Sequence, residues 1–302
     1  MIRRLAASVV AGAVLVGTAG CGAAGHSSAG GRPTVVASTD VWASVVRAVA
    51  GDTVEIKAII DNPAADPHSY ESKPVDAAEV ARADLVVYNG GGYDSFMDKF
   101  RAQSGDKPAV EAFTLLPAQP AGRTAPPNEH VWYDLPVVAQ VAQRVADELD
   151  RIDPAQAKLY AANLSRFRSD LDALSGKEQA IARAHGGEPV ALTEPVAVYL
   201  VEASKLRDVT PPKFASASEE GSDPPASVVA ATKDLLTQHR ATVLIYNPQT
   251  ETPLIGQLRA AAESAGVPVV NMTETLPPNT DYRSWMSGQL DQLAAALQGA
   301  KK

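Results

Sequence analysis

Cysteine and histidine are scarce in this sequence of 302 residues, which contains one cysteine and five histidines. A single cysteine, Cys21, cannot form a disulfide framework, and it leaves no thiol nucleophile in the folded part of the chain. Basic residues are outnumbered, 27 Lys and Arg against 35 Asp and Glu, which gives a net charge of −8. That balance argues against a nucleic-acid-binding protein, because such proteins neutralise phosphates with a basic face. The sequence also lacks HExxH and GxSxG, which argues against a zinc protease or a serine hydrolase.

The first 33 residues have the pattern of an export signal followed by a tether. Residues 1–4 are basic, and residues 5–16 are apolar but too few to span a bilayer as a helix. Residues 18–21, TAGC, resemble the bacterial lipobox, in which the cysteine is lipidated and becomes the first mature residue. We therefore expect a signal peptide over residues 1–20, a lipid on Cys21 and a flexible tether over residues 21–33. The protein would then be held at the outer face of the bacterial cytoplasmic membrane. An ordinary signal peptide with a chance cysteine is the alternative.

The rest of the chain alternates between short β-branched runs and helical patterns. Apolar runs typical of buried parallel strands lie at residues 34–37, 54–60, 85–88, 189–193, 241–246 and 267–271. Helical patterns lie between them, at residues 41–49, 77–83, 227–238 and 251–265. Such alternation predicts doubly wound α/β layers. We therefore expect an α/β fold with two lobes, over residues 34–152 and residues 186–302.

A long helix is predicted between the two lobes, over residues 153–185. Its start has an acidic N-cap, Asp153, then a proline, with Gln156 three residues after the cap. Apolar residues then recur at spacings of three, four and seven, at Tyr160, Leu164, Phe167, Leu171, Leu174 and Ile181. One continuous helix of this length, on the order of 45 Å, would join the lobes as a rigid spine and limit hinge closure. A three-helix bundle could supply the same pattern.

Four side chains with metal-binding atoms lie next to predicted strand ends or helix starts. His68 is in the loop after residues 54–60, His130 precedes a predicted helix, and Glu194 and Glu274 follow two strands of the second half. Ligands of open α/β sheets gather outside the carboxyl ends of the strands, so these side chains can all meet only between the lobes. Two imidazoles and two carboxylates form a closed shell suited to Mn²⁺, Fe²⁺ or Zn²⁺. Taken singly, each residue could equally cap or pack against a neighbouring element.

Other polar residues could support such a site. Tyr70 and Glu71 closely follow His68 and are candidates to accept the second N–H of its ring, although simple loop polarity explains them equally well. Asn247 and Gln249 follow a predicted strand and could hydrogen-bond a carboxylate ligand. The glycine run at residues 90–92 lacks the spacing of a phosphate loop and predicts a tight turn, with Asp94 as the cap of the next helix.

Several stretches, taken together, resemble the metal-binding lipoproteins that serve ABC importers. They are DPHSYE at residues 66–71, ADLVVYNGGG at residues 83–92, and residues 128–135, 192–194, 220–221 and 272–274. This manganese/zinc solute-binding family includes ZnuA, TroA and PsaA, and the resemblance covers essentially the whole mature chain. It implies two α/β lobes joined by one rigid helix, with one metal ion between them.

The resemblance also implies which residues bind the ion. The first two histidine ligands of the family fall on His68 and His130, and the third ligand falls on Glu194. The fourth, normally aspartate, falls on Glu274, so this position departs from the family pattern. Asp281, a few residues later, is the alternative fourth ligand.

The resemblance implies a non-catalytic carrier, expected to be monomeric, that delivers one ion to an ABC permease driven by its ATPase. The cargo would be Mn²⁺ or Zn²⁺, with Fe²⁺ also compatible. Residues 115–128 contain no histidine or acid, unlike the metal-collecting loop of many zinc members, and this favours manganese, as does the glutamate at the third position. A surface adhesin with the same fold and, less favoured, a metallohydrolase are the alternatives.

Overall fold

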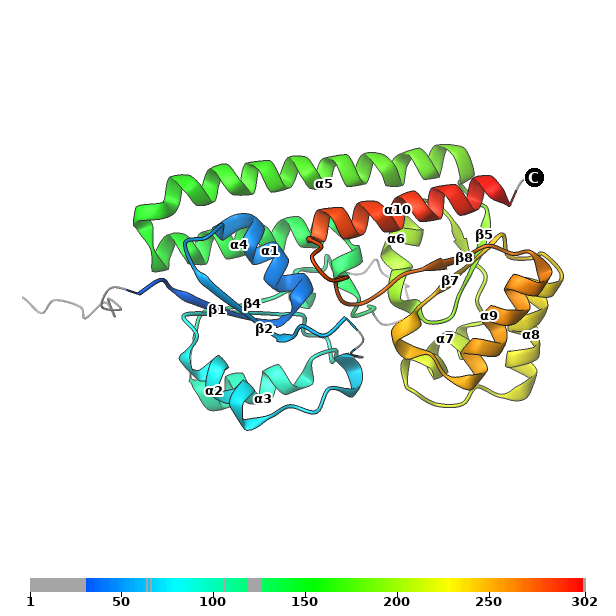
Figure 1. The fold of residues 1–302 in the computed structure, drawn as a ribbon, viewed down its shortest axis with the longest axis horizontal. Helices are drawn as coiled ribbons and strands as arrows, with labels where there is room; N and C mark the ends of the chain where they lie inside the picture. The colour runs from blue at the N-terminus through cyan, green and yellow to red at the C-terminus, as the bar shows by residue number, and fades with distance from the viewer. Residues whose placement is uncertain (1–30, 64, 66, 106, 119–126, 301–302) are drawn as a thin grey trace, which may run out of the picture. The chain divides into compact units, whose positions relative to one another are not determined.

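The computed structural model describes residues 31–63, 65, 67–105, 107–118 and 127–300, so the expected signal peptide and Cys21 lie outside the described residues. The first lobe is built on a parallel sheet with the strand order β2-β1-β3-β4. Its strands are β1 (Thr34–Thr39), β2 (Glu55–Ile60), β3 (Leu85–Tyr88) and β4 (Ala109–Glu111). Figure 1 shows α1 (Asp40–Ala50) and α4 (Leu135–Ile152) on one face, with α2 (Pro74–Arg82) and α3 (Ser95–Ser104) on the other.

The second lobe repeats this plan with the strand order β6-β5-β7-β8, again all parallel. Its strands are β5 (Pro189–Leu192), β6 (Arg207–Asp208), β7 (Val243–Tyr246) and β8 (Val269–Asn271). Its helices are α6 (Val198–Ala203), α7 (Pro212–Glu219), α8 (Ala226–Thr237) and α9 (Pro253–Ala265). The predicted pair of doubly wound α/β lobes is therefore confirmed. None of the described helices is long and apolar enough to cross a membrane.

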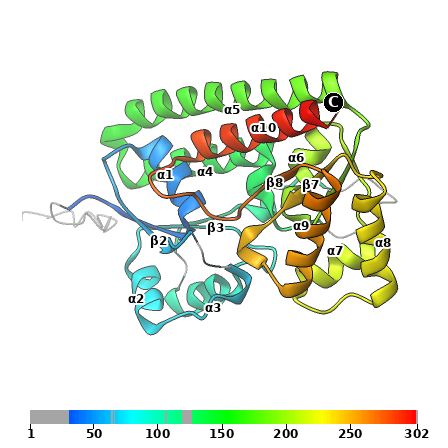
Figure 2. The ribbon, with the colours of Figure 1, turned by 45° about the vertical axis from the view of Figure 1, so that its right-hand side comes forward.

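The predicted long helix is α5 (Ala157–His185), a single helix of 29 residues, so the three-helix alternative is wrong. It begins later than expected, because residues 154–156 form a separate 3-10 turn and the Asp153 side chain makes no capping bond. Helix α5 packs against α1 and α4 of the first lobe and against α6 of the second. The C-terminal helix α10 (Tyr282–Gly299) runs beside it in both views (Figures 1 and 2).

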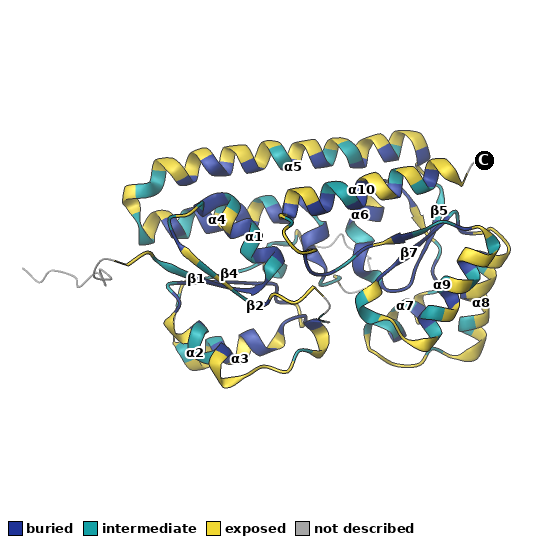
Figure 3. Cartoon of the chain, viewed as in Figure 1, coloured by how far each residue is buried: buried dark blue, intermediate teal, exposed yellow. Residues whose placement is uncertain are grey.

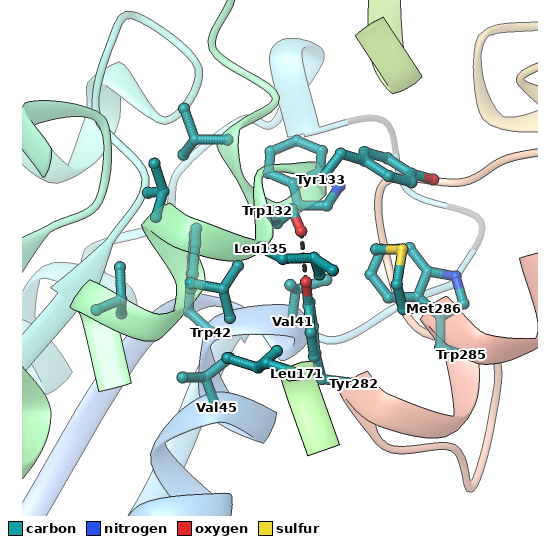
Figure 4. Packing of buried hydrophobic residues seen from close by; sticks show 14 of the residues in the cluster. Val41, Trp42, Val45, Trp132, Tyr133, Leu135, Leu171, Tyr282, Trp285 and Met286 are labelled. Atoms are coloured by element: carbon teal, nitrogen blue, oxygen red, sulfur yellow. Dashed lines mark hydrogen bonds between the residues drawn. The ribbon is translucent and has the colours of Figure 1, made fainter. Parts of the chain in front are cut away.

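Each lobe has a small hydrophobic cluster of its own, and a larger core contains residues of both lobes. It includes the faces of α1, α4, α5 and α10 that are dark in Figure 3, together with residues of both sheets. Its centre is aromatic: Trp42, Trp132, Tyr133 and Tyr282 are each at most 1% exposed. The Tyr282 hydroxyl donates to the carbonyl oxygen of Trp132 at 2.7 Å, which satisfies a polar group in the middle of the core (Figure 4). A core shared in this way favours small relative movements of the lobes, because large ones would expose apolar surface.

Candidate metal centre

Each of the four candidate ligands is placed by a short turn. His68 lies in the 3-10 turn Pro67–Ser69 after β2, and His130 directly precedes the turn Val131–Tyr133 that leads into α4. Glu194 directly precedes the turn Pro195–Ala197 after β5, and Glu274 lies three residues beyond β8. The two lobes therefore contribute one histidine pair and one carboxylate pair.

The structure brings all four side chains together. Their donor atoms, one from each residue, lie within 4.8 Å of one another. The two Nε2 atoms of His68 and His130 are 3.4 Å apart, and Glu274 Oε2 lies 3.7 and 3.9 Å from them. His130, Glu194 and Glu274 are buried, at 0%, 3% and 0% exposure, whereas the His68 side chain is 22% exposed. His68 is thus the member of the set that solvent reaches most easily.

These separations fit one bound cation. Four ligands at about 2.1 Å from a tetrahedral ion lie about 3.4 Å from each other. The two Nε2 atoms have this separation, and Glu274 Oε2 is 0.3 to 0.5 Å further from them. Two ionised carboxylates with two neutral imidazoles would also balance the charge of a divalent ion. Burying two carboxylates this close together is costly unless a cation compensates them.

His130 is held in the form that binds metals. Asn128 Oδ1 accepts the backbone N–H of His130 at 2.9 Å, so the amide atom at this position must be the oxygen. The same oxygen lies 2.8 Å from His130 Nδ1. Nδ1 must therefore carry the ring proton, so the lone pair of Nε2 faces the cluster. Burial, followed by the charge of His68, lowers the pKa of His130 well below 6.5 and keeps the ring neutral. Sequence reasoning missed Asn128, although it stands only two residues before the histidine.

Asn247 holds the two carboxylates. Its Nδ2 donates to Glu194 Oε2 at 2.9 Å and to Glu274 Oε1 at 2.7 Å, which is the supporting role proposed from the sequence. The Thr250 hydroxyl donates to the same oxygen of Glu194 at 2.5 Å. Both residues come from the turn that follows β7.

Gln249, on the same turn, links the second lobe to the His68 loop. Its Oε1 accepts the backbone N–H of Glu274 at 2.6 Å. Its Nε2 lies 2.8 Å from the carbonyl oxygen of Ala65 and 3.2 Å from that of Pro63, both in the loop before His68. One side chain therefore positions a ligand of each lobe.

Three other candidates from the sequence lie elsewhere. Asp281 is exposed and caps α10 by accepting the Ser284 N–H at 2.7 Å, so it is not part of the cluster. Tyr70 donates its hydroxyl to Asp76 at 2.9 Å, and Glu71 is exposed, so neither acts as the expected partner of His68. A ring that the sequence did not single out, Tyr93, packs edge-on against His68 with its centroid at 4.9 Å.

The turn at residues 90–92 and its neighbours are hydrogen-bonded to the backbone next to His130. Residues 90–92 all have positive φ, between 68° and 98°, as the predicted tight turn requires. Asp94 stands at the start of α3 but does not cap it; its carboxylate accepts the backbone N–H groups of Asn89 and Gly90, at 2.7 and 2.8 Å. Asn89 then donates to the carbonyl oxygen of Glu129 at 2.8 Å, next to His130.

A cavity of about 690 Å³ opens beside the cluster and is lined by His68, Glu194, Glu219, Glu220 and Glu251, among others. Burial and the neighbouring Glu129 raise the pKa of Glu219 to about 8. Ionised carboxylates in the lining of the cavity attract cations towards the cluster, but Glu219, with its raised pKa, is largely protonated at neutral pH and contributes little.

Known proteins share this fold and sequence pattern. A sequence model of the family described as zinc-uptake complex component A, periplasmic, matches residues 35–296. The manganese-binding lipoprotein MntA of Halalkalibacterium halodurans is 29% identical over 158 residues, 52% of this chain and 52% of the relative. The manganese ABC transporter substrate-binding lipoprotein PsaA of Streptococcus pneumoniae is 30% identical over 180 residues, 54% of this chain and 56% of the relative. The chain thus spans about half the length of the curated relatives it matches.

Solved structures give the same fold over a longer range. The periplasmic zinc binding protein TroA from Treponema pallidum aligns with a TM-score of 0.74 at 19% identity, covering 88% of this chain and 99% of that one. The names of these relatives describe metal-binding and substrate-binding proteins rather than enzymes.

Proposed function

The chain belongs to the periplasmic family of zinc-uptake complex component A, and from this premise we propose that it is the substrate-binding component of an ABC importer for a divalent metal. It captures one Mn²⁺ or Zn²⁺ ion, with Fe²⁺ also compatible, through His68, His130, Glu194 and Glu274. The observation that carries the proposal is the convergence of two imidazole and two carboxylate donors within 4.8 Å. Four protein donors close the shell around an ion, which suits capture better than catalysis.

Delivery completes the proposal. The loaded protein docks on a membrane permease, and the partner ATPase drives transport from the cytoplasmic side. A lipid on Cys21 holds the protein at the outer face of the membrane, and the protein acts as a monomer. We retain residues 34–152 and 186–302 as the two lobes, with residues 153–185 as the connection between them.

The test is metal stoichiometry. Elemental analysis after native purification should find about one divalent ion per chain, and equilibrium dialysis should return one ion to the metal-free protein. The double variant His68→Ala, His130→Ala removes both nitrogen donors and should weaken binding by more than about 100-fold, beyond the loss typical for residues that only support a ligand. His239→Ala is the matched control, because His239 is exposed beyond the end of α8. Unchanged binding in the double variant would refute the proposed site.

A further inference from the structure

We propose that Asn247 is a specificity-determining residue that biases the site towards Zn²⁺ and against Mn²⁺. The inference rests on the proposed function and adds to it the choice of metal. It runs opposite to the manganese preference expected from the sequence, and it depends on how one amide group occupies oxygens of both carboxylates.

The amide of Asn247 has one available orientation. Its Oδ1 accepts the backbone N–H of Gln249 at 3.0 Å, so its Nδ2 must point towards the carboxylates. The backbone N–H of Asn247 donates to Thr193 Oγ1 at 3.1 Å and fixes the start of the turn. The residue is completely buried, so water cannot replace these bonds. The group is therefore arranged before any ion arrives.

Both hydrogens of the amide are committed, one to each carboxylate. Nδ2 lies 2.9 Å from Glu194 Oε2 and 2.7 Å from Glu274 Oε1. A cation that bound both oxygens of either carboxylate would face the positive end of an N–H bond at one of them. Asn247 therefore disfavours bidentate binding and leaves each carboxylate to offer one oxygen to the ion. The Thr250 hydroxyl, 2.5 Å from Glu194 Oε2, adds to this effect on one side only.

The number of donors then selects the metal. With each carboxylate monodentate, the four residues supply two nitrogens and two oxygens. Four such donors satisfy Zn²⁺, which is almost always tetrahedral when the protein supplies every ligand. Mn²⁺ favours six oxygen-rich ligands, and the four protein residues can supply more than four donors only if a carboxylate becomes bidentate. The hydrogen bonds from Asn247 therefore withhold from Mn²⁺ the additional carboxylate oxygens that it needs.

The experiment compares dissociation constants for Zn²⁺ and Mn²⁺ in the wild type and in Asn247→Leu, a variant of similar size that cannot donate. We expect Zn²⁺ binding to weaken by about 10–100-fold, as is usual when a group that orients a ligand is lost. Mn²⁺ binding should weaken by a smaller factor, so the ratio of the Mn²⁺ to the Zn²⁺ dissociation constant falls. X-ray absorption of the Mn²⁺-loaded proteins should give fewer ligands in the wild type than in the variant.

Two further variants keep the test decisive. Thr250→Val removes one donor from one carboxylate and should shift the metal ratio in the same direction by a smaller factor, even if Asn247→Leu folds poorly. Asn163→Leu is the control, because Asn163 is also buried but donates to the Val49 carbonyl oxygen on α1. It should leave the ratio unchanged.

Equal losses for both metals in Asn247→Leu and no shift in Thr250→Val would overturn the role of Asn247, while leaving metal capture intact. A wild-type protein that bound neither ion would instead refute the proposed function, and this inference with it.

Discussion

The Gln249→Ala substitution should weaken metal binding although Gln249 is not itself a proposed ligand. The side chain joins the loop before His68 to the backbone of Glu274, so it holds donors of both lobes in place before the ion binds. Without it, the loop and the second lobe must be ordered at the expense of binding free energy. The loss should appear mainly as faster metal release, because association is less sensitive to such changes.

The magnitude follows from the hydrogen bonds. Nε2 has three acceptors within 3.2 Å, at Pro63, Ala65 and Thr275, but it has only two hydrogens to share among them. The substitution therefore removes one or two bonds to the first lobe. At about 1 kcal/mol net for each, the dissociation constant should rise about 5–30-fold.

Stopped-flow transfer of the ion to a chromogenic chelator measures the release rate, and titration calorimetry measures the dissociation constant. Gln257→Ala, which truncates an exposed glutamine on α9, is the matched control and should behave like the wild type. Release at the wild-type rate from the Gln249→Ala protein would refute the idea that this side chain couples the lobes.

Three other predictions concern pH and the core. Because the pKa of His130 lies well below 6.5 in the folded protein, the unfolded chain takes up a proton first as the pH falls below 6.5. The metal-free protein should therefore lose stability in that range, with a smaller slope in His130→Gln; equal slopes in urea titrations would contradict this. Burial raises the pKa of Asp40 from 3.8 to about 6. The folded protein therefore holds a proton on Asp40 that the unfolded chain has already lost, and the resulting stability is lost as the pH rises through 6. Asp40→Asn should therefore stabilise the protein more at pH 7 than at pH 4.5, and an equal gain at both would count against the assignment. Trp42→Ala should cost about 3–5 kcal/mol of unfolding free energy but retain one metal per chain, because Trp42 is a buried core residue and none of the four ligands. A urea midpoint near the wild-type value would show that this part of the core is not tightly packed.

Strands and the long helix could be predicted where the apolar pattern is strong. Buried runs such as LVVY at residues 85–88 carry apolar side chains, two of them β-branched, on both faces, which is typical of buried parallel strands. The stripe along α5 repeats at helical spacing over its whole length. Strands β4 and β6 were missed because they contain three and two residues, too few to form a pattern. These strands are defined by their pairing with β3 and β5, and the sequence of the short segments themselves does not indicate that pairing.

Candidate ligands could be named from strand ends and from family resemblance, but their surroundings could not. Tyr70 adjoins His68 in sequence, yet its hydroxyl is satisfied by Asp76 at the start of α2. Asp281 offers a carboxylate near Glu274 in sequence, but the nearby helix start uses it as a cap. The bonds that Gln249 makes to residues 63 and 65 join positions more than 180 residues apart. Such choices depend on the path of the backbone in space and on which partner each polar group meets there.

The most direct measurement of the central claim is anomalous diffraction from a crystal of the metal-loaded protein at the absorption edge of the bound ion. The account predicts a single strong peak, about 2.1 Å from His68 Nε2, from His130 Nε2 and from one carboxylate oxygen each of Glu194 and Glu274. A peak held by other side chains, such as Glu129 and Glu219, which form a second cluster with His130, would contradict it.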